Sequence, residues 1–306
     1  MDYSIWTSEK VLSAVLQGNI NLEIILANYF KGVVERVGSY EMDIQQIKTV
    51  EELDQRILTG IEQLDPLRKE IISVVSVFAG SRDDLLKKFL PSFFEQLLRM
   101  YEKKDINLYS GNNLDALRND HYRFFNQFLF ISLASVLVDA ECFEVLAELL
   151  HRRFNLYLKH YGQVRQVNFV RFRSYNYTLN EHLNTVSPKR VSVFADYVFK
   201  YAASDYEKLI KADILLYYIS LKYHTDDLLD DEWFPELSVY NRDREILPFM
   251  VSKAYFNKAK VLFGVETVEQ YKQYIKEVSP KVNPIAMFRI PSIESGLMYD
   301  TVGSME

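Results

Sequence analysis

The stretch "SDYEKLIKADILLYYISLKYHTDDLLDDEWFPE", Ser204 to Glu236, decides the fold of the second half of the chain. From Leu209 to Leu221 it is apolar on nearly every face of a helix, and a helix of this kind has to be surrounded by other elements. Five acids and then Trp233-Phe234-Pro235 follow, and proline cannot continue a helix. We therefore predict a buried central helix over 205–223, a solvated acidic loop, and a turn whose aromatic rings pack back onto the core.

The composition is that of a soluble globular protein rich in helices. Of the 306 residues, 48% are hydrophobic and 25% are charged, whereas Gly (10) and Pro (8) are scarce for a chain of this length. Few helix breakers indicate long helices. The 21 Tyr and 20 Phe indicate a core built largely from aromatic rings.

Apolar residues recur at spacings of three and four along most of the chain, and capping residues such as Thr49 with Glu52 and Thr267 with Gln270 mark helix starts. The sequence thus predicts an all-α fold, an irregular multi-helix array or bundle of roughly ten to twelve helices. The helices are expected near 8–17, 21–37, 50–64, 66–79, 82–103 with a break at Pro91, 119–139, 141–160, 164–176, 188–203, 205–223, 246–263 and 268–278. We expect an N-terminal helical segment (1–64), a main helical domain (65–279) and an extended or mobile C-terminal tail (280–306).

Several features point to a cytoplasmic protein without a membrane segment. The single cysteine, Cys142, excludes an intramolecular disulfide, and the N-terminus "MDYSIWTSEK" has neither the basic start nor the apolar run of a signal peptide. The longest apolar run, Phe128 to Val138, is too short to cross a bilayer and predicts a buried helix instead.

The acidic loop contains a DDxxD pattern, Asp226, Asp227 and Asp230, followed by Asp231. On a helix, Asp226 and Asp230 would share one face and could ligate Mg²⁺, as in class I isoprenoid synthases, which this pattern resembles. Such enzymes need a second acidic cluster, and "SRDDLLKKF" places lysines where its next acid should stand. We therefore expect no metal site and interpret Asp226, Asp227, Asp230 and Asp231 as a solvated patch available to arginines of this chain or of a partner.

The stretch from Arg152 to Asn180 is basic and aromatic, in contrast to the acidic loop. From Arg152 to Asn180 there is no acid at all, although the net charge of the whole chain is -6. Arginines beside exposed aromatic rings are typical of surfaces that neutralise phosphates and stack bases, whereas rings at helical spacing are typical of a core. The candidate ligand-binding or partner-binding residues are Arg152, Arg153, Arg165, Arg171, Arg173 and Tyr175.

One enzymatic alternative lies in the same stretch. Arg153 and His160 are separated by six residues, the spacing found in the Arg–His signature of HEPN ribonucleases, which this pair resembles. Two helical turns apart, both side chains could face one side, with His160 as acid or base and Arg153 on the phosphate. The polar residue typical after that arginine is here Phe154. No other catalytic motif and no metal-ligand spacing is present, so we predict no cofactor and no assigned catalytic residue.

Two groups of segments carry a resemblance to a known family. They are "RNDHYRFFNQFLFISLASVLVDAECFEVLAELL" (118–150) and a C-terminal series that includes "FRSYNYTLNEHL" (172–183), "WFPELSVY" (233–240) and "FMVSKAYFNKAKVLFGVETVEQYKQYI" (249–275). Together they resemble an all-helical region associated with bacterial TIR- and SEFIR-type signalling proteins, which are proposed to act in phage defence. In those proteins the helical region follows an effector domain, whereas residues 1–64 here are expected to be helical. The resemblance spans about 67–275 and carries no catalytic residue over.

The sequence as a whole predicts a non-catalytic helical module for recognition or scaffolding. What the resemblance implies is a sensor or assembly component of a bacterial antiviral or signalling system. The predicted partner is a protein, either a separately encoded effector or a second copy of this chain, and a nucleotide or nucleic acid could instead bind the basic stretch. Two enzymatic alternatives stay open: first the HEPN-like ribonuclease, and second the Mg²⁺-dependent class I isoprenoid-type enzyme.

Overall fold

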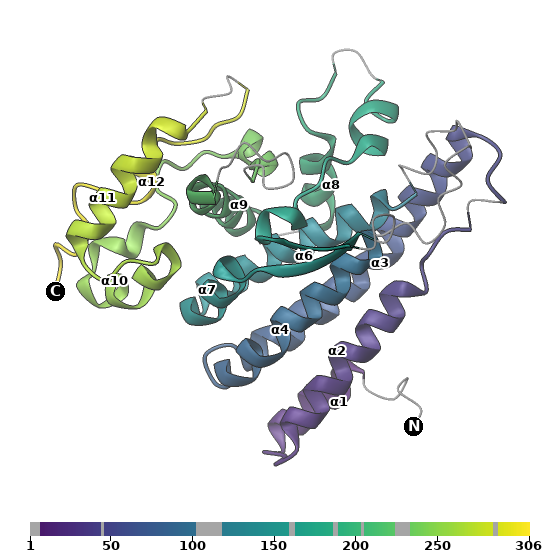
Figure 1. The fold of residues 1–306 in the computed structure, drawn as a ribbon, viewed down its shortest axis with the longest axis horizontal. Coiled ribbons are helices and arrows are strands. Elements are labelled where there is room, and N and C mark those ends of the chain that lie inside the picture. Colours follow the sequence, from purple (N-terminus) through teal and green to yellow (C-terminus); the bar gives the residue numbers. More distant parts are fainter. Residues whose placement is uncertain are drawn as a thin grey trace.

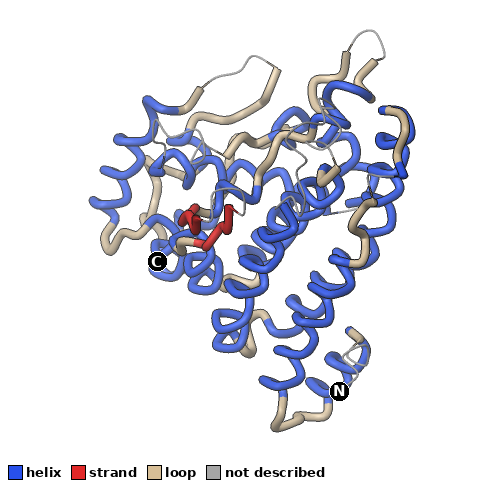
Figure 2. Tube along the Cα trace, turned by 45° about the vertical axis from the view of Figure 1, so that its right-hand side comes forward, coloured by secondary structure: helices blue, strands red, loops and turns tan. Residues whose placement is uncertain are grey.

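The computed structural model describes residues 7–43, 46–101, 118–158, 163–185, 189–202, 205–223, 233–283 and 287–306. Over these residues the protein is an all-α, multi-helix array with one small β-hairpin, as Figure 2 shows in blue and red. The predicted fold class is therefore confirmed. None of the helices in these ranges is long and apolar enough to cross a membrane.

The N-terminal half consists of long helices that lie side by side, in purple and blue in Figure 1. They are α1 (Ser8–Leu16), α2 (Leu22–Gly38), α3 (Val50–Phe78) and α4 (Asp83–Leu98). The cap predicted at the start of α3 is present, because the Glu52 amide donates to Thr49 Oγ1, and the Glu52 carboxylate accepts from the amide of Lys48, one residue before the N-cap. α2 packs against α4, and α3 packs against α6 (Asp120–Asp139).

Two prolines lie inside helices where the sequence predicts a helix start or a break. Pro66 is within α3, so the predicted helices 50–64 and 66–79 are one, and Pro91 is within a continuous α4. An internal proline costs a helix about 3 kcal/mol. Pro66 lies between the buried Leu64 and Leu67, and apolar burial on both sides of the proline outweighs that local cost.

The centre of the molecule is the pair α6 and α9 (Tyr206–Ser220), which pack against each other. Every residue of α9 from Ala212 to Ser220 is buried, as its continuous apolar pattern predicts. The apolar run 128–138 is likewise part of the largely buried α6. α8 (Val193–Ala202) lies beside α9, and α10 (Lys253–Ala259), α11 (Val268–Val278) and α12 (Ile293–Gly296) form the C-terminal side of the molecule.

The predicted helices 141–160 and 164–176 are wrong. α7 (Phe143–His151) ends early, and an antiparallel hairpin of β1 (Phe154–Leu158) and β2 (Gln163–Val167) follows. Buried and exposed side chains alternate along the first part of β1, since Phe154 and Leu156 are buried while Asn155 between them is exposed. The chain then continues through a short 3-10 helix, Phe169–Phe172, whose phenylalanines are fully buried.

The segment predicted as an extended or mobile tail has packed structure where it is described. Ile293, Leu297 and Val302 are buried, and the amides of Ile246 and Leu247 donate to the carbonyl of Gly296 at 2.9 and 3.0 Å. Ser252 and Met305 form an isolated parallel bridge. The tail therefore closes over the C-terminal side of α9.

We predict that Gly296→Ala loosens this closure. A Cβ at Gly296 would lie 2.8 Å from the Tyr218 ring, whose hydroxyl is held by donation to the Pro291 carbonyl. We expect the free energy of unfolding to fall by about 1–3 kcal/mol in urea denaturation. Asp300→Ala, an exposed position in the same segment, is the matched control and should stay within about 0.5 kcal/mol of the wild type. Equal stability of the two variants would contradict this packing.

Candidate functional site

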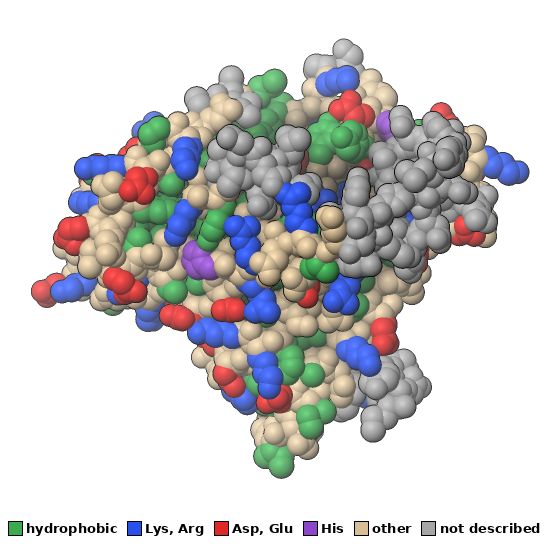
Figure 3. Space-filling model, viewed as in Figure 1, with side chains coloured by type: hydrophobic (Ala, Val, Ile, Leu, Met, Phe, Trp, Pro, Cys, Tyr) green, Lys and Arg blue, Asp and Glu red, His purple; other side chains and the backbone are tan. Residues whose placement is uncertain are grey.

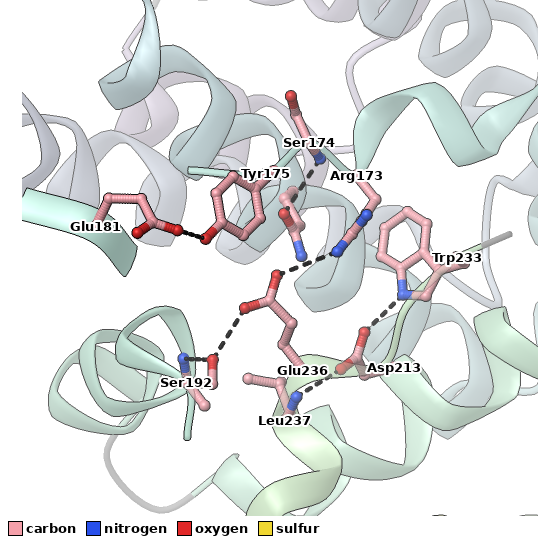
Figure 4. A network of polar contacts seen from close by, with 11 residues as sticks. Arg173, Ser174, Tyr175, Glu181, Ser192, Asp213, Trp233, Glu236 and Leu237 are labelled. Carbon is pink, nitrogen blue, oxygen red and sulfur yellow. Dashed lines mark hydrogen bonds and ion pairs between the residues drawn. The ribbon is translucent and has the colours of Figure 1, made fainter. Parts of the chain in front are cut away.

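The turn after the acidic loop is anchored to the core by Trp233, as the sequence predicts. The indole is fully buried, and its Nε1–H donates to Asp213 Oδ1 at 2.7 Å (Figure 4). The Trp233 amide donates to Ser220 Oγ at 2.9 Å, and the Leu237 amide donates to Asp213 Oδ2 at 2.8 Å. α9 therefore supplies both acceptors that hold segment 233–237 in place.

Asp213 is a lone carboxyl group on a helix face otherwise surrounded by apolar side chains. Burial raises its pKa to about 7, against the effect of the two N–H donors, and the nearby carboxylate of Glu236 raises it further. Each carboxyl oxygen of Asp213 accepts one hydrogen bond, so the group is tolerated inside the protein although it is 0% exposed.

Glu236, three residues after Trp233, turns its side chain inward to a second polar cluster. Its Oε2 accepts from the Ser192 hydroxyl at 2.9 Å, while Ser192 Oγ accepts from the Ala195 amide at the start of α8. Its Oε1 lies 3.9 Å from Arg173 Nη2, which is an ion pair but too long for a hydrogen bond. Burial raises the pKa of Glu236, and Arg173 opposes that shift.

A cavity of about 180 Å³ opens at this cluster, with Arg173 and Glu236 in its lining. Its aromatic walls include Tyr175 and Phe234, and Phe234 meets the Phe288 ring edge-on at 4.7 Å between centroids. The Arg173 guanidinium lies 5.6 Å from the centre of the Phe234 ring, and the Tyr175 hydroxyl donates to Glu181. We call this cavity the Arg173 pocket. Figure 4 shows the polar groups around it.

The structure brings two of the predicted binding residues, Arg173 and Tyr175, into the Arg173 pocket and distributes the others along the chain. Arg152 ends α7 and pairs with Glu148 at 3.2 Å, and Arg165 lies opposite Leu156 in the hairpin. Arg153 and Arg171, like Arg165, take part in further interactions. Figure 3 shows Lys and Arg side chains gathered over the middle of the face that carries the hairpin.

The aromatic rings of the basic stretch divide into two groups. Phe154, Phe169 and Phe172 are fully buried and belong to the core, whereas Tyr175 and Tyr177 are 37% and 49% exposed. The two tyrosine rings meet edge to face at 4.8 Å between centroids. Among the rings of the stretch whose side chains the structure describes, the exposed ones are therefore Tyr175, which lines the Arg173 pocket, and its neighbour Tyr177.

The geometry behind the ribonuclease hypothesis is absent from the described residues. That hypothesis places Arg153 and His160 two turns apart on one helix, but α7 ends at His151 and β1 begins at Phe154. His160 itself lies outside the described residues.

The predicted acidic patch, Asp226, Asp227, Asp230 and Asp231, also lies outside the described residues. The second acidic pair weighed for a metal site has structural partners, since the Asp83 carboxylate accepts from the Gly80 amide and Asp84 pairs with Arg82. Within the described part of the chain, no group of three or more His, Cys, Asp or Glu side chains could hold a metal ion.

The sequence reasoning missed Asp213, Glu236 and Ser192, which form the centre of the polar network. The available signal was the isolation of Asp213 inside "ADILLYYIS", because a single acid on the buried face of an apolar helix requires a partner. Glu236 gave no such signal, since an acid after a proline is most often exposed.

Comparison with known proteins identifies no relative of this chain. No family model matches it, and neither a curated protein nor a solved structure does.

We predict that Asp213→Asn destabilises the protein in a pH-dependent way. An amide has a single acceptor oxygen, so one of the two N–H donors loses its partner, and the free energy of unfolding should fall by about 1–3 kcal/mol at pH 5. Because the folded pKa of Asp213 is raised to about 7 from an unfolded value of about 3.9, the folded protein retains a proton there that the unfolded chain releases.

That contribution is fully present below about pH 4 and is lost as the pH rises through about 7. The difference between wild type and Asp213→Asn in urea unfolding should therefore be largest near pH 4 and shrink as the pH rises to about 7. His121, whose pKa is lowered to about 4 by burial, gives the opposite slope, but it is present in both proteins and cancels in the difference. A difference that does not change with pH would contradict the raised pKa of Asp213.

Proposed function

We propose that this chain is a non-catalytic recognition module that binds a protein partner, with the Arg173 pocket as the point of entry for one partner side chain. The observation that carries the proposal is the 3.9 Å separation between Arg173 Nη2 and Glu236 Oε1 at the base of a cavity with aromatic walls. A donor group and an acceptor group that do not fully satisfy each other can both bond to a third group placed between them.

The size and lining of the Arg173 pocket suit an amino-acid side chain. A cavity of about 180 Å³ is smaller than the 300–1,000 Å³ typical of pockets for drug-sized ligands. Tyr and Arg, which both line it, are enriched among the residues that dominate protein–protein binding energies. Tyr175 is 37% exposed at the pocket and offers an aromatic contact around the entry point.

Charge favours one of the two ligand classes that the sequence leaves open. A phosphate bound to Arg173 would also meet the buried carboxylate of Glu236, and like charges at this range repel strongly away from water. A side-chain amide or hydroxyl meets both groups favourably, since it donates to Glu236 and accepts from Arg173. A protein partner with such a side chain therefore fits the pocket better than a phosphorylated ligand.

The resemblance to helical regions of TIR- and SEFIR-type signalling proteins supplies a context for this proposal. In that context the partner is a separately encoded effector or a second copy of this chain, and the module senses or assembles within a bacterial antiviral or signalling system. Neither enzymatic alternative has a specific arrangement of described residues in its favour, so recognition without catalysis is the function that we propose.

Val191→Trp is the variant that tests the pocket. Val191 lines it, is 40% exposed and lies next to Ser192, so an indole there fills the cavity without removing a buried charge. Reversing Arg173 instead would leave Glu236 buried beside a second acid and would confuse binding with unfolding. We expect the melting temperature to be unchanged and recovery of the native partner to fall at least about tenfold, the effect of losing one anchor contact.

The measurement is quantitative mass spectrometry of proteins that co-purify with the tagged full chain from its native cells. Val77→Trp is the matched control, because Val77 is 37% exposed on α3 and does not line the pocket. A partner lost with Val191→Trp and kept with Val77→Trp supports the proposal. A partner recovered equally with all three proteins, or no partner recovered with the wild type, would refute it.

A further inference from the structure

Three arginines with no acidic partner among the described residues line one groove, at the other end of the segment that Trp233 anchors. Arg242, Arg244 and Arg289 are exposed and, with Ile290 and Pro291, border a groove of about 440 Å³. No salt bridge or hydrogen bond to a carboxylate satisfies any of these three side chains within the described ranges. Like charges repel, so three unsatisfied guanidinium groups around one groove form a site prepared for an anion.

The groove is built by the buried side chain of Asn241, which is 4% exposed. Its Nδ2 donates to the carbonyl of Asp243 and to that of Arg289, both at 2.8 Å, and its Oδ1 accepts from the Asp243 amide at 3.1 Å. The Arg289 amide donates in turn to the Ser238 carbonyl at 3.1 Å. One asparagine thus fixes the two chain segments that carry the arginines.

Two acids neighbour these arginines in the sequence. Asp243, between Arg242 and Arg244, is turned to another partner, and Glu245, after Arg244, is exposed but does not line the groove. The Asp243 carboxylate pairs with Lys211 of α9 at 2.8 Å. Asp243 therefore neutralises the charge of Lys211. The guanidinium groups of Arg242 and Arg244, on either side of Asp243 in the sequence, remain available to a ligand.

A second pocket adjoins the groove and shares Asn241, Arg242 and Asp243 with it. Its volume is about 450 Å³, and its aromatic wall is a cluster of Phe199, Tyr206 and Tyr240 with ring centroids 4.7 to 5.8 Å apart. The Phe199 ring is 57% exposed and the Tyr240 ring 40% exposed. Exposed rings can stack on a planar base, and the neighbouring arginines can bind the phosphates attached to it.

We propose that the two connected cavities form a binding site for a free nucleoside polyphosphate, with the base against Phe199 and Tyr240 and the phosphates on Arg242, Arg244 and Arg289. The open aromatic wall beside the arginines fits a planar base that is joined to phosphates. The net charge of -6 and the acid Glu207 in the lining of the aromatic pocket disfavour a long nucleic-acid backbone. This site is separate from the Arg173 pocket and does not depend on the function proposed there.

Isothermal titration calorimetry of the purified full chain tests the site with ATP, ADP, AMP, adenosine and tripolyphosphate as probes. We expect one saturable site, with affinity rising with the number of phosphates from adenosine to ATP. Arg242→Ala, Arg244→Ala and Arg289→Ala should each weaken ATP about tenfold, because each removes one charge-assisted contact. Arg56→Ala, an exposed arginine paired with Glu52 on α3, is the control and should leave ATP binding unchanged.

Phe199→Ala separates a nucleotide site from a simple anion site. Since the ring contacts the base, this variant should weaken ATP about tenfold and leave tripolyphosphate unchanged. The proposal is overturned if no nucleotide binds saturably at millimolar concentration, or if the arginine variants bind ATP as the wild type does. Equal binding of tripolyphosphate and ATP with no effect of Phe199→Ala would also overturn it. A short RNA that competes with ATP at lower concentration would assign the groove to nucleic acid and likewise overturn the proposal.

Discussion

The hydrogen bond between the Trp233 indole and the Asp213 carboxylate is the constraint on which both sites depend. A carboxyl group in the middle of a buried helix is costly unless its oxygens are bonded, and no neighbour on α9 supplies a donor to it. Trp233 and Leu237 supply both donors from outside the helix. The chain that leaves α9 therefore returns to the same helix, and the direction in which it continues from Trp233 is fixed.

One segment that starts at this anchor carries side chains of both candidate sites. Phe234 and Glu236 line the Arg173 pocket, a 3-10 helix spans Glu236–Tyr240, and Asn241 and Arg242 line the arginine groove. The Ser238 carbonyl, between the two sites, accepts from the Arg289 amide and so holds the chain segment that carries Arg289. The position of segment 233–242 relative to α9 thus sets the geometry of both cavities.

The parts of the fold that could be predicted are those with an unambiguous pattern. The 205–223 helix is apolar on nearly every face, so it must be buried between other helices. Trp233, before Pro235, packs into the core as predicted, whereas Phe234 is half-buried in the wall of the Arg173 pocket. The hairpin could not be predicted in the same way, because "RRFNLYL" places apolar residues at spacings that suit either a strand or a helix end. The helix boundary predicted at Pro66 and the break predicted at Pro91 do not occur, because packing against distant parts of the chain outweighs the local cost of proline. A local sequence pattern contains no information on that packing.

The candidate sites were only partly predictable, because the average charge of a stretch of sequence does not show which acids and bases pair in the folded chain. The run 152–180 contains no acid, so its arginines were expected to be available for a ligand. In the structure, however, Arg152 pairs with Glu148 and Arg173 with Glu236. Arg153, Arg165 and Arg171 have further interactions. By contrast, "NRDRE", 241–245, is nearly neutral on average and gave no signal. There Asp243 turns to Lys211 and Asn241 turns inward, so the two arginines are left facing a common groove with Arg289, which is distant in sequence. Available positive charge in this protein therefore follows from where the acids point, and that is a property of the fold and not of the composition.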